Sequence, residues 1–339
     1  MEDMHQILAA ICSGTKGVMA TIVHVEGSAY KKEGAAMLFT EEGGRIGMLS
    51  AGCLEEDLQA RIRENPRKTG AELIEFDMRS SDDFSWGAGS GCNGKISVLI
   101  EEIDEQYHCD LMKLQQKIKQ GEAVLMVKKI GCKAAHPQYL FISENNEIFG
   151  KWDQKILEIV SVWQDDQEQF HKRMIIDKAN RYYLHVIRAK PRFIVFGAGA
   201  DARPLVELAA MSGFSVTVAD WRPAFCTKEH FPNADNLLTG FPAELIRQLH
   251  LTSDDYVMVM THQFEKDDEI VARLFDQELL YFGILGTKNR TMRLLGMQSV
   301  PETITSPAGL AIGASGAEEI AVSIVAQLIQ IRNRQQVRV

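Results

Sequence analysis

Residues 192–202 read Arg-Phe-Ile-Val-Phe-Gly-Ala-Gly-Ala-Asp-Ala, and this stretch decides the fold of the C-terminal half. The apolar run predicts a short strand, and the Gly-x-Gly-x-x-Ala pattern after it is typical of the first strand-to-helix turn of a dinucleotide-binding fold. Gly197 permits the tight turn, and Gly199 lets a phosphate approach the backbone. A helix is expected over 203–212, with Arg203 close to any phosphate bound at its N-terminus.

The same alternation of strands and helices continues along the chain, with strands expected over 214–219, 256–260 and 281–285. Asp220 follows one of these strands, at the point where a dinucleotide fold places the carboxylate that accepts from a ribose hydroxyl. Because parallel strands end at one edge of their sheet, the candidate binding residues are expected along that edge. They are Gly197, Gly199, Asp220, Thr261, His262, Gly286 and Thr287. For His262, an orienting hydrogen bond in a turn is an equally good interpretation. The pattern predicts a Rossmann-like, doubly wound parallel sheet over 189–339.

The N-terminal half, residues 1–188, has a less regular succession of elements and predicts an α+β domain, of which 105–188 could form a separate middle piece. Helices are expected over 2–12, 53–64, 105–120 and 154–164, and strands over 17–25, 36–40, 45–48, 73–76, 95–101, 123–129, 174–177 and 181–188.

Six cysteines are scattered along the chain without a Cys-x-x-Cys pair, which argues against a structural zinc site. Cys53 follows Gly52 at the start of an expected helix, where the helix dipole favours the thiolate. Cys92 follows Gly91 in a loop too rich in glycine to be core. Both cysteines are therefore candidates for function. The other four are expected to be buried residues that only fill space in the core: Cys12, Cys109, Cys132 and Cys226.

Ser28, after a turn glycine, could receive a phosphate, although a solvated turn explains it equally well.

The charge balance and the distribution of apolar residues exclude several classes of protein. The formal net charge is −9, which argues against nucleic-acid binding, because neutralising phosphates needs clustered Lys and Arg. No apolar run reaches the 18 residues that a membrane-spanning helix needs. The acidic N-terminus is unlike a secretory signal, so we expect a cytoplasmic protein. A homodimer is the expected assembly, since symmetric dimers are the commonest oligomers.

Several short motifs recur in the order that is known from one protein family. They are Gly27-Ser28-Ala29, Gly52-Cys53-Leu54-Glu55, Gly91-Cys92-x-Gly94, the segment Gly-Ala-Gly-Ala-Asp-Ala-Arg-Pro-Leu from Gly197, Met260-Thr261-His262, Gly283–Thr287, and Ser306-Pro307-x-Gly309-Leu310-x-Ile312-Gly313-Ala314. Together they resemble the XdhC/CoxI family, the accessory proteins of molybdenum hydroxylases such as xanthine dehydrogenase.

The resemblance implies an N-terminal XdhC/CoxI domain, a C-terminal Rossmann domain and a non-enzymatic role as a chaperone. The molybdenum cofactor (molybdopterin) would be bound, helped through sulfuration and passed to a xanthine dehydrogenase-type apo-enzyme, with a cysteine desulfurase as a further partner. Carried onto this sequence, Cys53 and Cys92 become the candidates for touching the cofactor's molybdenum or its transferable sulfur, in keeping with the affinity of thiolates for soft metals.

Three other interpretations are weighed against this one. The glycine pattern and Asp220 also suit an NAD(P)-dependent oxidoreductase, or a nucleotide-binding scaffold. No Tyr-x-x-x-Lys pair and no paired His and acid mark a hydride-transfer site in the C-terminal half of the sequence. A complete xanthine dehydrogenase is excluded, because the chain is too short and lacks the cysteine spacing of iron–sulfur clusters.

Overall fold

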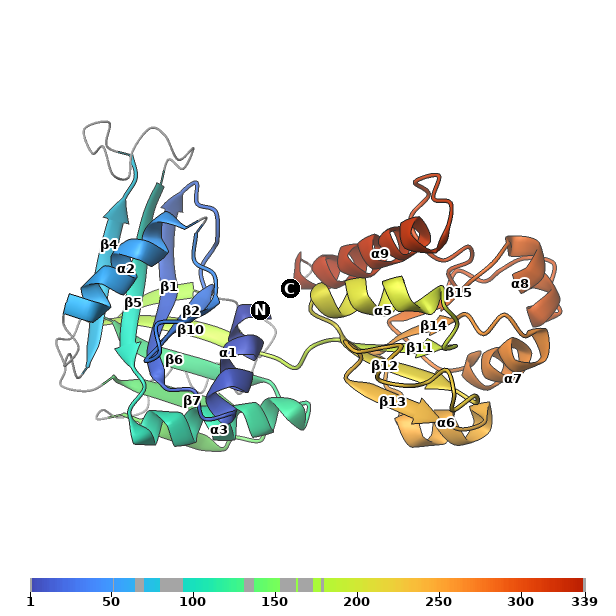
Figure 1. Cartoon of the computed structure of the whole chain (residues 1–339), viewed down its shortest axis with the longest axis horizontal. Helices are drawn as coiled ribbons and strands as arrows, with labels where there is room; N and C mark the ends of the chain where they lie inside the picture. Colours follow the sequence, from blue (N-terminus) through green and yellow to red (C-terminus); the bar gives the residue numbers. More distant parts are fainter. Residues whose placement is uncertain are drawn as a thin grey trace. The chain divides into compact units, whose positions relative to one another are not determined.

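A computed structural model of the chain describes residues 2–50, 52–64, 70–79, 94–130, 137–152, 163, 173–177 and 180–337. The chain divides into two compact units, which we call unit 1 (Met1–Ala189) and unit 2 (Lys190–Val339) (Figure 1).

Unit 1 begins with an antiparallel sheet whose strands lie in the order β3-β2-β1-β5-β4. The strands are β1 (Gly17–Gly27), β2 (Ala36–Thr40), β3 (Arg45–Gly47), β4 (Ala71–Asp77) and β5 (Gly94–Glu102). The same part of the chain contains two helices, α1 (Glu2–Cys12) and α2 (Cys53–Glu64). Side chains of β1 alternate between the two faces of the sheet, as the period of a strand requires. Ala20 and Ile22 pack with α2 in one apolar cluster, whereas Met19 and Val23 pack with α1 in another.

A second antiparallel sheet in unit 1 has the order β8-β7-β6-β10-β9. Its strands are β6 (Val124–Ile130), β7 (Tyr139–Ser143), β8 (Ile148–Lys151), β9 (Arg173–Asp177) and β10 (Asn180–Ile187), and helix α3 (Glu105–Lys119) precedes them. Met126 of β6 and Tyr139 of β7 join the cluster that contains Met19, so the two sheets share one core. Glu101 of β5 and Lys128 of β6 form an ion pair inside it.

Unit 2 is a parallel sheet in the order β13-β12-β11-β14-β15 with helices on both faces (Figure 1). The strands are β11 (Arg192–Phe196), β12 (Ser215–Asp220), β13 (Asn236–Thr239), β14 (Tyr256–Val259) and β15 (Tyr281–Ile284). The helices are α5 (Ala202–Met211), α6 (Pro242–Leu249), α7 (Phe264–Leu274), α8 (Lys288–Leu295) and α9 (Ala317–Val337). Phe193 and Val195 pack towards α5 and α9, and Ile194 and Phe196 pack towards α6, α7 and α8.

This arrangement confirms the predicted doubly wound parallel sheet and the α+β character of the N-terminal half. The strand β13 and the three short helices α6, α7 and α8 were not predicted individually, because they are brief and draw much of their stability from packing on the sheet. Of the helix expected over 154–164, only Trp163 lies within the described residues.

Candidate functional site

The carboxyl ends of the strands of unit 2 form one edge, and the glycine-rich turn after β11 lies at its centre. The backbone of Gly197 has φ 122°, a region that side-chain-bearing residues rarely adopt. A Cβ atom at this position would lie 2.5 Å from the carbonyl oxygen of Met260 at the end of β14. The Gly197 N–H donates to the carbonyl oxygen of Ala219 on β12 at 2.9 Å. Glycine is therefore required here because the turn is drawn tightly against both neighbouring strands.

Asp220, the last residue of β12, uses both carboxylate oxygens inside the protein. Its Oδ2 accepts from the Ala198 N–H at 2.7 Å, and the guanidinium of Arg222 donates to both oxygens at 2.8 and 2.9 Å. Burial alone would raise the pKa of this carboxyl, but the hydrogen bonds from Arg222 and Ala198 outweigh it and hold the pKa below its usual value. A ribose hydroxyl could reach this carboxylate only if Arg222 moved away.

The end of β14 is fixed by a buried carboxylate on the next helix. Asp267 of α7 accepts from the Thr261 N–H at 3.2 Å and from the Thr261 hydroxyl at 2.5 Å. It also forms an ion pair with Arg290 of α8. Because Thr261 is buried, it acts in the structure as a connection between strand and helix, and the exposed residue beside it is His262.

His262 points out of the edge and is oriented by a carboxylate from the glycine-rich turn. Its Nε2 lies 2.6 Å from Oδ2 of Asp201, and its side chain is 58% exposed. The backbone of His262 has φ 60°, an uncommon conformation for a non-glycine residue. A Cβ at Gly199 would lie 2.5 Å from Oδ1 of Asp201, so the small residue at this position leaves room for the pair. The geometry supports the orienting hydrogen bond and also leaves the ring accessible. The expectation that the C-terminal half has no paired His and acid was therefore wrong, because His262 and Asp201 are 61 positions apart in the sequence and meet only in the fold.

The remaining candidates of unit 2 flank this edge. Gly286 follows β15 with φ 121°, and Thr287 caps α8 by accepting from the Arg290 N–H at 3.3 Å. Arg203, in the first turn of α5, is exposed.

In unit 1, the start of α2 at Cys53 is fixed by a bracket of hydrogen bonds. The Ser50 hydroxyl accepts from the N–H groups of Gly52 and Leu54 at 3.2 and 3.3 Å and donates to the carboxylate of Glu55. The same carboxylate accepts from the N–H groups of Ser50 and Leu49 at 2.6 and 3.0 Å. Gly52 has φ 125°, which explains the glycine before the cysteine. These hydrogen bonds stabilise the start of α2, of which Cys53 is the first residue.

Glu55 is 3% exposed, so its charge is balanced by these donors rather than by solvent. Burial would raise the pKa of Glu55, but the hydrogen bonds from Ser50 and Leu49 lower it below its ordinary value. The carboxylate of Glu55 is thus already occupied by N–H and O–H groups of Leu49 and Ser50.

Ser28 is exposed and follows β1, beside the start of β5. A Cβ at Gly94 would lie 2.6 Å from the carbonyl oxygen of Ser28, so the two backbones are in close contact. Gly94 stands two positions after Cys92 in the sequence, but Cys92 and Gly91 lie outside the described residues. Ala29 after Ser28, Ile96 of β5 and Leu54 of α2 contribute to one apolar cluster, which brings the three segments onto the same face of the sheet.

Three other cysteines are described, and all are free thiols: Cys12 is half-buried, Cys109 is exposed and Cys226 is buried. Burial raises the pKa of Cys12 and of Cys226. Within the described ranges, no three His, Cys, Asp or Glu residues gather closely enough to hold a metal ion. None of the described helices is long and apolar enough to cross a membrane.

Sequence reasoning missed the residues that hold the candidates in place. These are Ser50 and Glu55 in unit 1, and Asp201, Arg222, Asp267 and Arg290 in unit 2. A usable signal existed for Arg222 and Glu55, because each stands two residues from a candidate. The pair between Asp267 and Arg290 spans 23 positions and joins two helices, so no local pattern marks it.

Comparison with known proteins identifies the class that this fold and these motifs define. Residues 193–328 match the family described as XdhC Rossmann domain, and residues 10–77 match the XdhC and CoxI family. Residues 105–188 match a family described as BH1974-like, central domain. The chain belongs to the XdhC/CoxI family, as the resemblance of its motifs predicted.

Full-length relatives agree with this assignment. The chain is 44% identical to a Bacillus subtilis protein whose name describes it as a probable xanthine dehydrogenase subunit, over 98% of this chain and 99% of the relative. It is 20% identical to an Escherichia coli protein named molybdenum cofactor insertion chaperone PaoD, over 96% of this chain and 87% of the relative. A crystal structure from Bacillus halodurans, described as a xanthine dehydrogenase, matches with a TM-score of 0.84 and 41% identity, over 98% of this chain and 96% of that one.

Proposed function

We propose that this protein is an accessory protein that binds the molybdenum cofactor and delivers it, in sulfurated form, to a xanthine dehydrogenase-type molybdenum hydroxylase. The observation that carries the proposal is similarity along both units to the Bacillus subtilis relative named for xanthine dehydrogenase, joined by the more distant relative named a cofactor insertion chaperone.

In unit 1, the thiolates of Cys53 and Cys92 are the proposed contacts to the molybdenum or to its transferable sulfur, because thiolates are soft ligands. Two features of the structure support the role of Cys53. It is the first residue of α2, where the helix dipole favours the thiolate. The bracket of Ser50 and Glu55 also fixes the backbone around it. Gly52 and Gly91 precede the two cysteines in the sequence, and Ser28, whose backbone is in contact with Gly94, is the proposed phosphate contact.

In unit 2, the proposed ligand is a phosphate-bearing group at the glycine-rich turn, such as the phosphate of molybdopterin or of a nucleotide. Gly197 and Gly199 would give it access to the backbone, and the exposed side chains of Arg203 and His262 would face its charge. Thr261, Gly286 and Thr287 complete this edge. Asp220 would act through the turn, since its carboxylate holds the Ala198 N–H and Arg222.

The alternative function is that of an NAD(P)-dependent oxidoreductase. The glycine-rich turn favours it, but the carboxylate that would bind the ribose is 1% exposed and bonded to Arg222. Calorimetric titration of the full chain with NAD and with NADP distinguishes the two functions. Tight binding followed by turnover of a reduced substrate would support the oxidoreductase, and absence of heat would remove it.

The direct test of the chaperone function uses the full chain purified from cells that synthesise the cofactor. Mass spectrometry of the released ligands should find molybdopterin in a near-stoichiometric amount, and mixing with cofactor-free hydroxylase should restore its activity. Protein that carries no pterin and restores no activity would overturn the proposal. A cysteine desulfurase as the source of sulfur and a homodimeric assembly are further parts of the proposal, and pull-down and light scattering test them separately.

A further inference from the structure

Helix α8 of unit 2 carries only positive charge, although the chain as a whole is acidic. Its residues include Lys288, Arg290 and Arg293 and no carboxylate, while the net charge of the protein is −9. Arg290 is paired with Asp267. Among the residues that the structure describes, no carboxylate forms an ion pair with Lys288 or Arg293, and both side chains are exposed. Their charge is therefore available to a partner.

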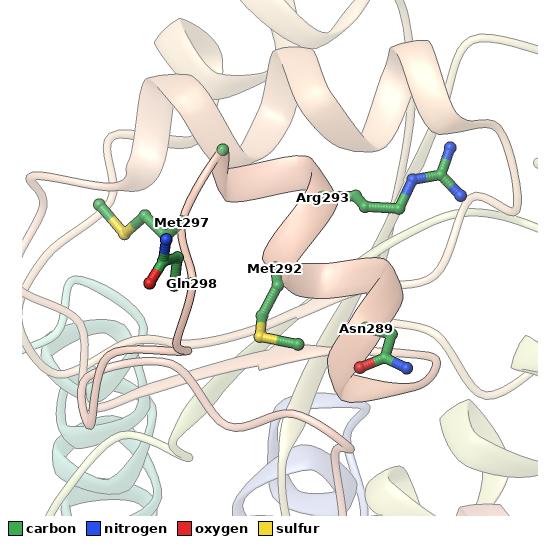
Figure 2. Close-up of a pocket in the computed structure, with 6 residues that line it drawn as sticks. Asn289, Met292, Arg293, Met297 and Gln298 are labelled. Atoms are coloured by element: carbon green, nitrogen blue, oxygen red, sulfur yellow. The ribbon is translucent and has the colours of Figure 1, made fainter.

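An open depression of about 560 Å³ lies along the same helix (Figure 2). It is lined by Asn289, Met292, Arg293, Gly296, Met297 and Gln298. Figure 2 shows Met292 extending from α8, and Met297 extending from the segment that follows the helix. Met297 is 42% exposed. Methionine side chains are flexible and polarisable, so they adapt to irregular apolar groups of a partner.

The patch continues from the depression to the first residue of α7. Phe264 is 41% exposed, and the guanidinium of Arg293 lies 5.6 Å from the centre of its ring. Arg293 thus connects the exposed aromatic ring with the methionine-lined depression. Phenylalanine, methionine and arginine are the residue types that are enriched in protein interfaces. We call Phe264, Lys288, Met292, Arg293 and Met297 the α8 patch.

We infer that the α8 patch is the surface on which the protein docks an acidic, partly apolar face of the hydroxylase that receives the cofactor. The inference rests on the proposed function, which requires such a recipient. Charge complementarity selects the occupant: unpaired cations favour carboxylates of a partner, and the methionines and Phe264 favour an apolar side chain among them. A second copy of the chain, which carries Glu318 and Glu319 in the first turn of α9, would be the competing acidic partner.

The test measures binding of the cofactor-free hydroxylase to the immobilised full chain by biolayer interferometry, at low and at high salt. The variant Arg293→Glu/Met297→Glu should bind at least about tenfold more weakly and lose most of the salt dependence. Matched controls on other exposed positions of unit 2, Arg247→Glu on α6 and Met211→Glu on α5, should bind like the unchanged protein. All four positions are exposed, and thermal melting checks that the variants fold.

The outcomes separate this inference from the function on which it rests. If the unchanged chain binds the hydroxylase and the α8 variant binds equally well, the docking surface is wrong while the chaperone function stands. If the unchanged chain does not bind the hydroxylase, delivery to that enzyme and the inference both fail. If the α8 variant instead abolishes self-association of the chain in light scattering and leaves hydroxylase binding intact, the patch belongs to a dimer interface and the inference is overturned. Molybdopterin content should be the same in all samples.

Discussion

Two buried carboxylates of unit 2 lie at the carboxyl edge of its sheet, whereas the most buried charges of unit 1 lie between two sheets. In unit 2, Asp220 and Asp267 each tie the end of a strand to a neighbouring segment at the edge where the candidate residues lie. In unit 1, Lys128 is fully buried and pairs with Glu101 on the face of the first sheet that is opposite to α2.

The difference shows that similar ion pairs serve different purposes. At the edge of a parallel sheet, they shape the loops that would receive a ligand. Between the sheets of unit 1, the pair fixes how one sheet packs on the other, and it lies away from Cys53. Substitutions in the two units should therefore affect stability and ligand binding in different proportions.

The largest expected effect is that of Lys128→Met in unit 1. Removing the cation leaves Glu101 buried without a partner, so we expect a loss of about 3–5 kcal/mol in the free energy of unfolding. The double variant Glu101→Leu/Lys128→Met should be closer to the unchanged protein, because it removes the buried charges together. Urea unfolding combined with hydrogen-exchange mass spectrometry should show lost protection in β5 and β6 but not in β11.

A matched control for Lys128→Met is Lys95→Met, which removes a half-exposed pair with Glu75. It should change stability by no more than about 0.5 kcal/mol. An equally small change for Lys128→Met would show that the buried pair does not fix the packing of the sheets.

The next effect in size is that of Asp267→Ala in unit 2. It removes the acceptor of the Thr261 hydroxyl and the partner of Arg290, and we expect a loss of about 2–4 kcal/mol. Hydrogen exchange should become faster at the end of β14 and in α8, whereas the exchange rates of unit 1 should not change. Asp268→Ala, on the same helix but exposed, is the control. Equal effects of the two substitutions would contradict the role of Asp267 at the edge.

The two glycines of the turn should differ from each other. Gly197→Ala places a Cβ against the Met260 backbone in an unfavourable conformation and should cost about 1–3 kcal/mol. The Cβ of Gly199→Ala meets the end of the Asp201 side chain and lies at ordinary contact distance from the His262 ring, so the substitution should cost less than about 1 kcal/mol but separate Asp201 from His262. Urea midpoints and the NMR signals of His262 report both effects. If Gly199→Ala is the more destabilising, the turn has a different geometry.

The smallest expected effect is the acid dependence of each unit. The pKa of Glu55 in unit 1 and that of Asp220 in unit 2 are lowered in the folded protein. A lowered carboxyl pKa contributes stability that is fully present above the unfolded-state pKa and is lost as the pH falls through the folded-state pKa. Glu55→Gln should make the stability of unit 1 less dependent on pH in the acidic range, and Asp220→Asn should do the same for unit 2 only. Hydrogen exchange of each unit, measured at several pH values from neutral to acidic, checks this. A loss of stability with rising pH in this range would contradict the lowered pKa values of the two carboxyl groups.

The fold of unit 2 could be predicted from the sequence because its signals are local. The apolar run at 192–196 and the glycines that follow it define the turn, and parallel topology then places Thr261 and Gly286 at the same edge. The partners of these residues could not be predicted in the same way. Arg290 reaches Asp267 from another helix, and the role of Asp220 depends on how Arg222 folds back onto it.

Unit 1 was harder to predict, because its sheets pair strands that are distant in the sequence. β1 pairs with β5, and β6 pairs with β10, across long intervening segments. Local patterns identified most of the individual strands, but no pattern stated that Lys128 would face Glu101. The position of Glu55 two residues after Cys53 was a usable signal, but its hydrogen bonds with Ser50 were not predictable, since a first-turn acid usually indicates only a favourable dipole interaction.

The most direct test of the account is the molybdopterin content of full-length cysteine variants purified in parallel from cells that make the cofactor. Cys53→Ala and Cys92→Ala should each contain at least about tenfold less pterin than the unchanged protein. Cys109→Ala, which removes an exposed thiol elsewhere in unit 1, should contain the same amount. Unchanged pterin content in both Cys53→Ala and Cys92→Ala would contradict the claim that these two thiolates hold the cofactor.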